Sequence, residues 1–493
     1  MKKLKTAAAL ALALSLSLPL IACGGSSDSA PSSGGEDQAQ AQSAETAAAE
    51  TTTESLLPAA DYGGAEFVIC DNEPRWSGMF ETIDQYAEAE NGDTINDAVF
   101  RRNTAVEDRF HVTIKEHKTA DSLKDSTNSI MAGDHAYDMV WVFKGESPQL
   151  TTKGLLLDMK NLPLIALDQP WWDQNCRREL SIAGKTLLMT GALSIMDDDN
   201  TMMLVFNKKV MSDVGLEAPY QKALDRTWTW DVLYDMSKQV YSDLNGDGSY
   251  DQNDRYGFYV QYYDSGYLLA SLGTKYVTTS DTGELTLTLM EGNTVNAIEK
   301  LVQMTNDQQT TYFRQKIKAA DGYIEGINLF KSDHYLFYVS EAIDFPHFRD
   351  MESDWGLCPV PMLNEEQGRY YLTLDGGPIF FGIPIDVQDK ERTSVIIEAL
   401  CEESTSTLTP AYYDIVLARK FARDNESEAM LELMQSMRTY DVGLIYEWSG
   451  ITDIAANCVI KNSTDIMSLY TKVSEKIEKS MNDAYDAISA IEG

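Results

Sequence analysis

Ala65-Glu66-Phe67-Val68-Ile69-Cys70 is a short run of mostly apolar residues, and it predicts a strand. A helical pattern follows over residues 94–110, with Asp93 or Thr94 able to cap the helix. Strand-like, helical and again strand-like stretches come next, at 111–114, 122–132 and 137–142. This alternation is typical of an α/β protein, in which helices pack on the faces of a mostly parallel sheet. Ligands of such sheets bind beyond the carboxyl ends of the strands.

The remainder of the chain continues this pattern. Helices are predicted at 230–240, 293–304, 390–401 and 427–437, a strand at 379–383, and an extended segment with prolines at 355–361. A last helix is expected from about residue 463, because apolar residues recur there at steps of three and four and form one stripe. No later stretch is a long apolar run, so we expect no membrane span beyond the N-terminal region.

Residues 1–22 have the parts of a secretory signal peptide. Three lysines lie among the first five residues, residues 7–20 are rich in Ala and Leu, and the small residue Ala22 precedes Cys23. Leu20-Ile21-Ala22-Cys23 resembles the bacterial lipobox, which implies cleavage before Cys23 and acylation of its thiol. The lipid would then tether the protein outside the membrane, each buried methylene contributing about 0.8 kcal/mol. An ordinary cleaved signal with an incidental cysteine is the alternative.

Composition sets the character of the mature chain. Residues 23–56 hold almost no large apolar side chains, so we expect a disordered tether that begins at the lipidated cysteine. Formal net charge is -37, and it becomes -40 without residues 1–22, which carry three lysines and no acids. A nucleic-acid partner is not expected, because phosphate repels such a surface.

The cysteines are widely spaced and form no CxxC pair. They are Cys23, Cys70, Cys176, Cys358, Cys401 and Cys458. This spacing indicates neither a disulfide framework nor a zinc site. We expect most of the five after Cys23 to be buried as small apolar groups, which leaves room for one bridge.

A calcium-binding loop fits the twelve residues 243–254. Oxygen-bearing side chains fall at positions one, three, five, nine and twelve: Asp243, Asn245, Asp247, Asp251 and Asp254. Gly248 allows the sharp turn at position six, and Ser249 would offer its backbone carbonyl. Asp254 stands where the usual loop has Glu, so we expect weaker coordination or the help of water. Bound calcium would be structural; the alternative is a polar surface turn that holds no metal.

Four further stretches carry the motifs of a known family. Tyr137-Asp138-Met139-Val140 with residues 150–158 matches "DVV … la..G.l.dL", and residues 204–219 resemble "lyYNKdlfeeaGl..P". Residues 229–233 resemble "TWdEl", and residues 355–361 resemble "ygv.p.P". By their order and spacing the chain resembles the bacterial extracellular solute-binding proteins of ABC importers, in the branch that includes maltodextrin binders. Phe206 stands where the family usually has Tyr, and Val232 stands where it usually has an acid. These departures leave the class of ligand open, whereas the expected fold does not depend on them.

The resemblance implies a two-lobe, hinged fold of type II, each lobe a mostly parallel sheet flanked by helices. Lobe 1 would take residues 57–200 and 382–440, and lobe 2 residues 203–378 and 445–493, with several crossings of the chain between them. Ligand contacts to both lobes would shift the population towards a closed state. The permease subunits of the importer would bind that state.

Candidate ligand contacts come from the strand ends and the crossings. Aromatic faces suit sugar rings, while acids and amides accept hydroxyl hydrogen bonds. The candidates are Trp76 and Trp141 near strand ends, Asp197 and Asp199 at the first crossing, Asp375 at the second and Trp448 near the third. The alternatives are core packing for the tryptophans and a solvated acidic turn for Asp197 and Asp199. Trp171 and Trp172 are open to either interpretation.

These features together predict a lipid-anchored binding protein that captures a saccharide, most simply an oligosaccharide, for an ABC importer. An enzyme is not expected, because the sequence has no GxSxG, and its five histidines form no HExxH or paired metal spacing. One alternative is a peptide or cationic solute, which an acidic cleft would attract. The others are a surface sensor or adhesin, and a carbohydrate-active enzyme, which needs only two carboxylates.

Overall fold

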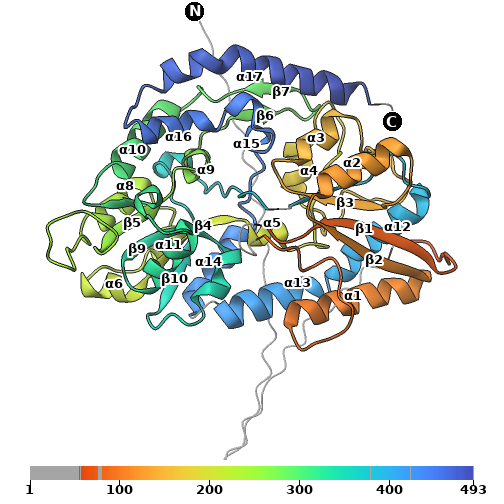
Figure 1. Cartoon of the computed structure of the whole chain (residues 1–493), viewed down its shortest axis with the longest axis horizontal. Coiled ribbons are helices and arrows are strands. Elements are labelled where there is room, and N and C mark those ends of the chain that lie inside the picture. The colour runs from red at the N-terminus through yellow and green to blue at the C-terminus, as the bar shows by residue number, and fades with distance from the viewer. Residues whose placement is uncertain (1–54, 56, 76–79, 378, 422–423, 492–493) are drawn as a thin grey trace, which may run out of the picture. The chain divides into compact units, whose positions relative to one another are not determined.

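The computed structural model describes residues 55, 57–75, 80–377, 379–421 and 424–491. Within them, two large sheets lie side by side, and helices flank each sheet (Figure 1). The first sheet has the order β11-β3-β1-β2, and β11 is its antiparallel member. Its strands are β1 (Ala65–Asn72), β2 (Val112–Thr119), β3 (Met139–Val142) and β11 (Phe380–Gly382).

The second sheet is mixed, with the order β10-β4-β9-β5-β8. β9, β5 and β8 are parallel to one another, whereas β4 runs antiparallel to its neighbours β9 and β10. Its strands are β4 (Met202–Asn207), β5 (Tyr256–Val260), β8 (Thr311–Phe313), β9 (Tyr335–Glu341) and β10 (Trp355–Cys358). A separate hairpin pairs β6 (Val277–Thr279) with β7 (Leu285–Leu287). Because β5 and β9 are parallel, their carboxyl ends share one edge of the sheet.

Helices fill the connections and cover both sheets. They are α1 (Thr94–Phe110), α2 (Ser122–Ala132), α3 (Ser147–Thr152), α4 (Gln174–Leu180), α5 (Met196–Asp199), α6 (Lys208–Asp213), α7 (Tyr220–Leu224), α8 (Trp230–Ser237), α9 (Asp264–Ser271), α10 (Thr294–Thr305), α11 (Gly322–Lys331), α12 (Lys390–Ser404), α13 (Leu408–Pro410), α14 (Asn425–Gln435), α15 (Val442–Tyr446), α16 (Asp453–Ile460) and α17 (Ile466–Ser489). Short 3-10 turns are η1 (Met159–Asn161), η2 (Arg314–Lys316), η3 (Ala342–Phe348), η4 (Glu365–Gln367) and η6 (Trp448–Gly450), and η5 (Ala411–Phe421) is a π-helix. Helix α17 contacts α3 beside the first sheet as well as α16 and β7, and it runs along the top of Figure 1.

Capping explains why the first helices begin where the sequence predicts. The Asp93 carboxylate accepts the backbone N–H groups of Ile95 and Asn96, at 3.0 and 3.2 Å, and α1 begins at Thr94. Asp121 caps α2 in the same way, through the N–H of Lys124 at 3.0 Å. Both helices therefore have the predicted bounds, and the predicted strands and later helices are confirmed to within a few residues.

Buried ion pairing joins the first sheet to a helix that is distant in sequence. The Asp138 carboxylate, at the start of β3, accepts Val68 N–H at 2.9 Å. It also accepts Arg392 Nη2 and Thr393 Oγ1, both at 2.9 Å. Since Arg392 and Thr393 lie in α12, one carboxylate connects β1, β3 and the helix that returns from the second sheet.

The chain passes between the sheets at two neighbouring segments that pair with each other. Thr201 and Leu374 form an antiparallel bridge, and Met202 N–H donates to Thr373 O at 2.9 Å. Asp375 N–H in turn donates to Asn200 O at 3.0 Å. Gly377 is required here, because a Cβ at this position would lie 2.3 Å from Asn200 Oδ1.

The lobe boundaries remain a prediction, because residues Ser55–Gly493 form a single compact unit. Within this unit, α14 contacts α7 and β10 of the second sheet, although the sequence analysis assigned residues up to 440 to the first lobe. The five described cysteines are all buried and unpaired. None of the described helices combines the length and apolar character that a membrane crossing needs. The predicted signal peptide, Cys23 and nearly all of the predicted tether lie outside the described residues.

Trp141 belongs to the core of the first sheet. Its side chain is fully buried and packs against Phe381 of the neighbouring strand β11, with the ring centroids 5.4 Å apart. Strand β3 has a neighbour on each side, and all four of its residues are buried.

Trp141→Ala should therefore lower the free energy of unfolding by about 3–5 kcal/mol, measured by chemical denaturation, because it opens a large cavity. Met131→Ala is the control: Met131 is 75% exposed, so a change within about 0.5 kcal/mol is expected. A loss below about 1 kcal/mol for Trp141→Ala would contradict its place in the core.

Candidate functional site

Ionisable side chains gather where strands of both sheets end beside the crossings. We call Lys144, Asp264, Tyr267, Glu341, Asp344 and Asp375 the interlobe cluster. Lys144 follows the carboxyl end of β3, Glu341 ends β9, and Asp264 and Tyr267 lie on α9 just after β5. Asp344 lies in the turn η3 after β9, and Asp375 lies in the second crossing. This edge is where α/β sheets bind ligands.

Lys144 connects the two sheets through its ammonium group. Its Nζ donates to the Tyr267 hydroxyl at 2.8 Å and to the Leu374 carbonyl at 3.2 Å. The same ammonium lies over the Tyr267 ring, 4.5 Å from the centroid. Burial lowers the pKa of Lys144, while nearby Asp375 and Glu447 oppose that shift. Lys144 is thus a buried cation between acidic groups.

The carboxyl groups of the cluster are largely removed from water. Asp264, Glu341 and Asp344 are 4%, 6% and 1% exposed. Burial raises the pKa of Asp264 to about 8, although the N–H of Gln261 donates to it at 2.9 Å. Burial also raises the pKa of Glu341, Asp344 and Asp375, and Lys144 opposes the shift at Asp375. Neighbouring carboxyls add to the rise at Asp264 and Glu341.

Neighbours from α11 and η2 complete this region. The Tyr323 hydroxyl donates to Asp344 Oδ1 at 2.5 Å, and the Ser340 hydroxyl donates to Asp344 Oδ2 at 2.9 Å. Arg314 donates to Gln261 Oε1 at 2.7 Å and lies over the Tyr323 ring, 5.4 Å from its centroid. The region therefore presents hydroxyl, amide, carboxyl and aromatic groups, which suit a polar organic ligand.

Asp375 is the one candidate of the sequence analysis that belongs to this cluster. Trp448, also a candidate, is 6% exposed and packs on Tyr446, with ring centroids 4.9 Å apart, and the preceding residue Glu447 acts electrostatically on Lys144. The Tyr446 hydroxyl lies 2.9 Å from Thr151 Oγ1 of α3. Trp76 lies outside the described residues. Trp141 is wholly buried, so it has no surface with which to touch a ligand in this structure.

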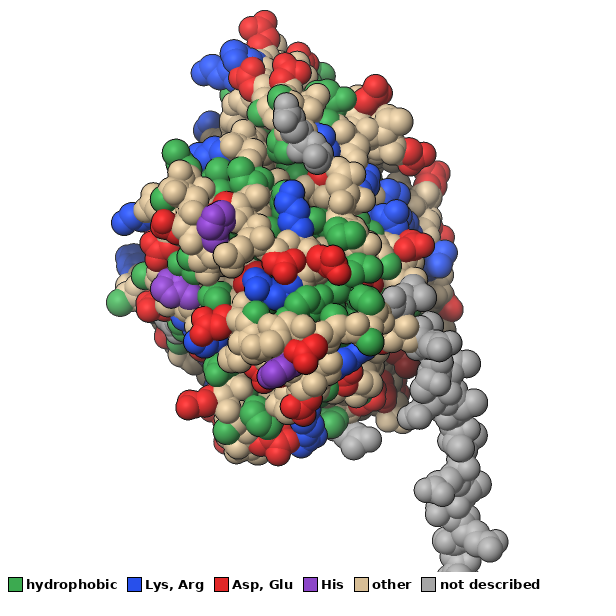
Figure 2. All heavy atoms as spheres, turned by 90° about the vertical axis from the view of Figure 1, so that its right-hand side faces the viewer, with side chains coloured by type: hydrophobic (Ala, Val, Ile, Leu, Met, Phe, Trp, Pro, Cys, Tyr) green, Lys and Arg blue, Asp and Glu red, His purple; other side chains and the backbone are tan. Residues whose placement is uncertain are grey.

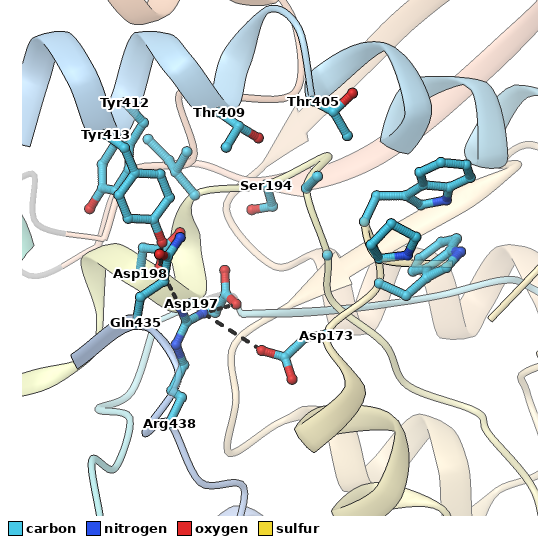
Figure 3. A pocket seen from close by; sticks show the side chains of 16 residues that line it. Asp173, Ser194, Asp197, Asp198, Thr405, Thr409, Tyr412, Tyr413, Gln435 and Arg438 are labelled. Carbon is cyan, nitrogen blue, oxygen red and sulfur yellow. Dashed lines mark hydrogen bonds and ion pairs between the residues drawn. The ribbon is translucent and has the colours of Figure 1, made fainter. Parts of the chain in front are cut away.

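Asp197 lines a different cavity, of about 300 Å³, which we call the tryptophan pocket, and Asp199 contacts Tyr412 of its lining. Its lining includes Trp171, Trp172, Asp173, Asp197, Asp198, Tyr412, Tyr413 and Arg438. Figure 3 shows Arg438 reaching Asp197, Asp198 and Asp173, and these are ion pairs. Tyr412 donates to Asp199 Oδ1 at 2.6 Å.

The polar groups of the tryptophan pocket largely satisfy one another. Both indole N–H groups, of Trp171 and Trp172, donate to the Glu398 carboxylate at 2.9 and 3.1 Å. The Tyr440 hydroxyl donates to Asp173 at 2.8 Å. A ligand there would have to compete with these contacts, so we take the interlobe cluster as the stronger candidate site.

Sequence reasoning missed Lys144, Asp264, Tyr267, Glu341 and Asp344. Lys144 comes two residues after a buried strand, and that position was the available signal for it. The other four follow or end β5 and β9, two strands that the sequence analysis did not identify. Tyr267 meets Lys144 only through a tertiary contact between residues 123 positions apart in the sequence.

On the face of the molecule that Figure 2 shows, charged side chains are less concentrated than in the interlobe cluster. Figure 2 shows the side of the molecule on which the first sheet lies, and there acidic and basic side chains are interspersed. Among the described residues, no three His, Cys, Asp or Glu side chains are arranged to hold a metal ion. This statement covers both the interlobe cluster and the carboxylates of the predicted calcium loop.

In the predicted calcium loop, the side chains accept backbone N–H groups of the loop itself. Asp243 accepts Gly246 N–H at 2.6 Å and Gly248 N–H at 2.9 Å. Asp247 accepts Ser249 N–H at 2.7 Å. Asp254 is fully buried, and its Oδ1 has no hydrogen-bond partner in the described part of the chain. Position twelve of the loop therefore holds a buried carboxylate oxygen that no donor among the described residues satisfies.

Solved structures share this fold over most of the chain. One of them is the galacto-N-biose/lacto-N-biose I-binding protein of a Bifidobacterium longum ABC transporter, in complex with lacto-N-biose. Its TM-score is 0.56 at 14% sequence identity, and the match covers 86% of this chain and 99% of that protein's chain. A cyclo/maltodextrin-binding protein complexed with maltotetraose has a TM-score of 0.53 at 14% sequence identity. The match covers 86% of this chain and 96% of that protein's chain. The ABC substrate-binding protein Lmo0181 from Listeria monocytogenes, in complex with cycloalternan, has a TM-score of 0.52 at 15% identity, covering 86% and 98%.

No protein-family model matches the sequence. No curated protein matches it at a significant level. At such low identity the structural similarities establish the fold alone: the chain has the two-lobe α/β fold of extracellular solute-binding proteins. The fold class predicted from the sequence is therefore confirmed.

Asp264 gives this site a dependence on pH. The folded protein holds the Asp264 proton up to about pH 8, whereas the unfolded chain releases it near its ordinary pKa of 3.8. The unfolded state is therefore favoured increasingly as pH rises through this window. Arg314 and Asp375 are the charged neighbours that act on Asp264.

Between pH 4 and 8, the free energy of unfolding should decrease less in Asp264→Asn than in the unmodified protein. The two decreases should differ by at least about 1 kcal/mol, because the amide cannot ionise. Denaturant titrations across this range measure it. Asp281→Asn alters an exposed aspartate in the β6–β7 hairpin and should follow the unmodified protein. If the free energy of unfolding has the same pH dependence in Asp264→Asn and in the unmodified protein, then folding does not raise the pKa of Asp264 to about 8.

Proposed function

We propose that the protein is the lipid-anchored substrate-binding component of an ABC importer, and that it captures an oligosaccharide between two closing lobes. The observation that carries the proposal is the fold that 86% of the chain shares with binding proteins whose complexes contain lacto-N-biose, maltotetraose and cycloalternan. The sequence motifs of the family support it independently. Permease subunits of the importer would be the protein partners.

The interlobe cluster supplies chemistry that suits a sugar. Carboxyl groups accept hydrogen bonds from hydroxyls, and the Tyr267 and Tyr323 rings offer flat apolar surface beside them. Because Lys144 joins residues of both sheets, a ligand that contacts this cluster would contact both lobes. Such a ligand would favour closure in proportion to its contacts with the closed state.

The cellular location of the protein follows from the sequence of its N-terminal region. We propose cleavage before Cys23, acylation of its thiol, and a tether over residues 23–56 that holds the folded part outside the membrane. The membrane would be contacted through this lipid alone. An importer subunit needs such a position, since it must deliver solute to a permease from the outer side.

We propose that the protein binds its ligand for transport without altering it, and that it is neither an enzyme nor a sensor. Release of an altered sugar from the complex would instead indicate a carbohydrate-active enzyme, and binding without uptake would indicate a sensor or adhesin. A peptide or cationic solute is the second candidate ligand, and the excess of carboxyl groups over cations in the interlobe cluster favours it.

We also propose that residues 243–254 hold a structural calcium ion. Asp243, Asn245, Asp247, Asp251 and Asp254 would supply side-chain oxygens and Ser249 its carbonyl. Gly246 and Gly248 have φ values of 75° and 74°, which favour glycine at these turns, and Asp254 Oδ1 is the buried oxygen without a partner. Calcium would fix the loop that leads into β5.

Thermal unfolding of the full chain in detergent, against mono- and oligosaccharides, peptides and polyamines, tests the proposed function. A ligand that binds only the folded state at 100 times its Kd adds about 2.7 kcal/mol of stability. We expect one saccharide class to raise the midpoint. A response to peptides alone would keep the fold and refute the saccharide assignment.

Asp247→Ala tests the calcium loop. It should lower the thermal midpoint in calcium and leave the midpoint unchanged in chelator, because only the metal-bound state loses a ligand. Asp281→Asn, outside the loop, should respond equally in both conditions. The proposal fails if Asp247→Ala costs the same stability with calcium and with chelator.

A further inference from the structure

Carboxyl groups outnumber cations inside the interlobe cluster. Four carboxyl groups, those of Asp264, Glu341, Asp344 and Asp375, share this space with the single ammonium of Lys144. Lys144 directs its hydrogen bonds to Tyr267 and to the Leu374 carbonyl, not to a carboxylate. Arg314 donates to Gln261. The cations present therefore do not pair with all of these carboxyl groups.

Glu341 is the carboxyl group that lacks a partner. It is 6% exposed, and in the described part of the chain its carboxylate makes no hydrogen bond or ion pair. Asp344, by contrast, accepts two hydroxyl groups, and Asp264 accepts a backbone N–H. Buried carboxylates are ordinarily paired or hydrogen-bonded, because an unpaired one is costly.

The surroundings of Glu341 show what kind of group is missing. The charged groups that act on it are Asp375, Asp344 and Asp264, all of them acids, and burial together with these neighbours raises its pKa well above the usual value. A neutral hydroxyl could donate one hydrogen bond to Glu341, but it would do little to stabilise the ionised form of this carboxyl group. A cation would satisfy the hydrogen bond and the charge together.

We propose that the ligand of the interlobe cluster carries a protonated amino group, which binds against Glu341 and Asp375. The inference rests on the proposed function and narrows its ligand to amino sugars. An ammonium has three donors on a compact charge, so it can bridge two neighbouring carboxylates, and Asp375 is the neighbour that acts most strongly on Glu341. The sugar ring would then lie towards Tyr267 and Tyr323, which border the same cluster.

A divalent metal fits this cluster less well than an amine. Among the described residues, no three acidic, histidine or cysteine side chains converge as metal ligands. Asp344 already uses both of its oxygens for hydroxyl donors. An ammonium needs only two of the carboxyls and leaves these hydrogen bonds intact.

Isothermal titration calorimetry on the full chain in detergent at pH 7 tests the proposal. The probes are matched pairs: glucose with glucosamine, galactose with galactosamine, and β-1,4-linked N-acetylglucosamine tetramers with their free-amine form. We expect the amine member to bind at least tenfold more tightly, and Glu341→Gln to remove that preference. Asp375→Asn is the second variant, with the same expected loss. Glu299→Gln, on the exposed side of α10, should keep the preference.

Each outcome decides the inference. A neutral member that binds as tightly as its amine overturns it, yet leaves the proposed saccharide function standing. A preference for the amine that survives both Glu341→Gln and Asp375→Asn overturns it as well. If no pair binds, the amino-sugar inference fails, and the wider panel of neutral saccharides decides separately on the proposed function.

Discussion

The pairing of the two crossings is the interaction on which the arrangement of this protein depends. Asn200 to Met202 and Thr373 to Asp375 run antiparallel, joined by backbone hydrogen bonds of 2.9 and 3.0 Å. They hold the carboxyl edge of the second sheet beside the first, and Lys144 N–H adds a bond to Gly377 O at 2.9 Å. Two short extended segments can change their dihedral angles more readily than a packed core can, which is what a hinge requires.

Polar groups lie around these crossings in two sets with different properties. The interlobe cluster contains a buried carboxyl without a partner and an ammonium shared between the sheets. In the tryptophan pocket, Arg438 neutralises Asp197 and Asp198, and Glu398 holds both indoles. Saturated contacts rigidify a structure, whereas an unsatisfied buried group is where a ligand gains most from binding. This contrast, more than cavity size, distinguishes the candidate site from the neighbouring pocket.

Sequence alone predicted much of the fold and little of the site, for physical reasons. Helices α1 and α2 have local signals, their aspartate caps and apolar periodicity, so their bounds could be predicted. Asp375-Gly376-Gly377 could be placed at a crossing because glycine permits close approach of Asn200. Trp141 lies near a strand end, but all four residues of β3 are buried, so its side chain packs in the core although its place at the strand end suggested ligand contact. Tyr267 and Glu341 become site residues only through tertiary contacts, and no spacing in the sequence records these.

A crystal structure of the full chain with a bound saccharide tests most directly the claim that the crossings create the binding site. The account predicts density for the sugar between Lys144 and Glu341, with contacts to residues of both sheets and with the paired crossings beside it. Density in the tryptophan pocket, among Trp171, Tyr412 and Arg438, would contradict it, and so would a sugar that touches residues of one sheet only.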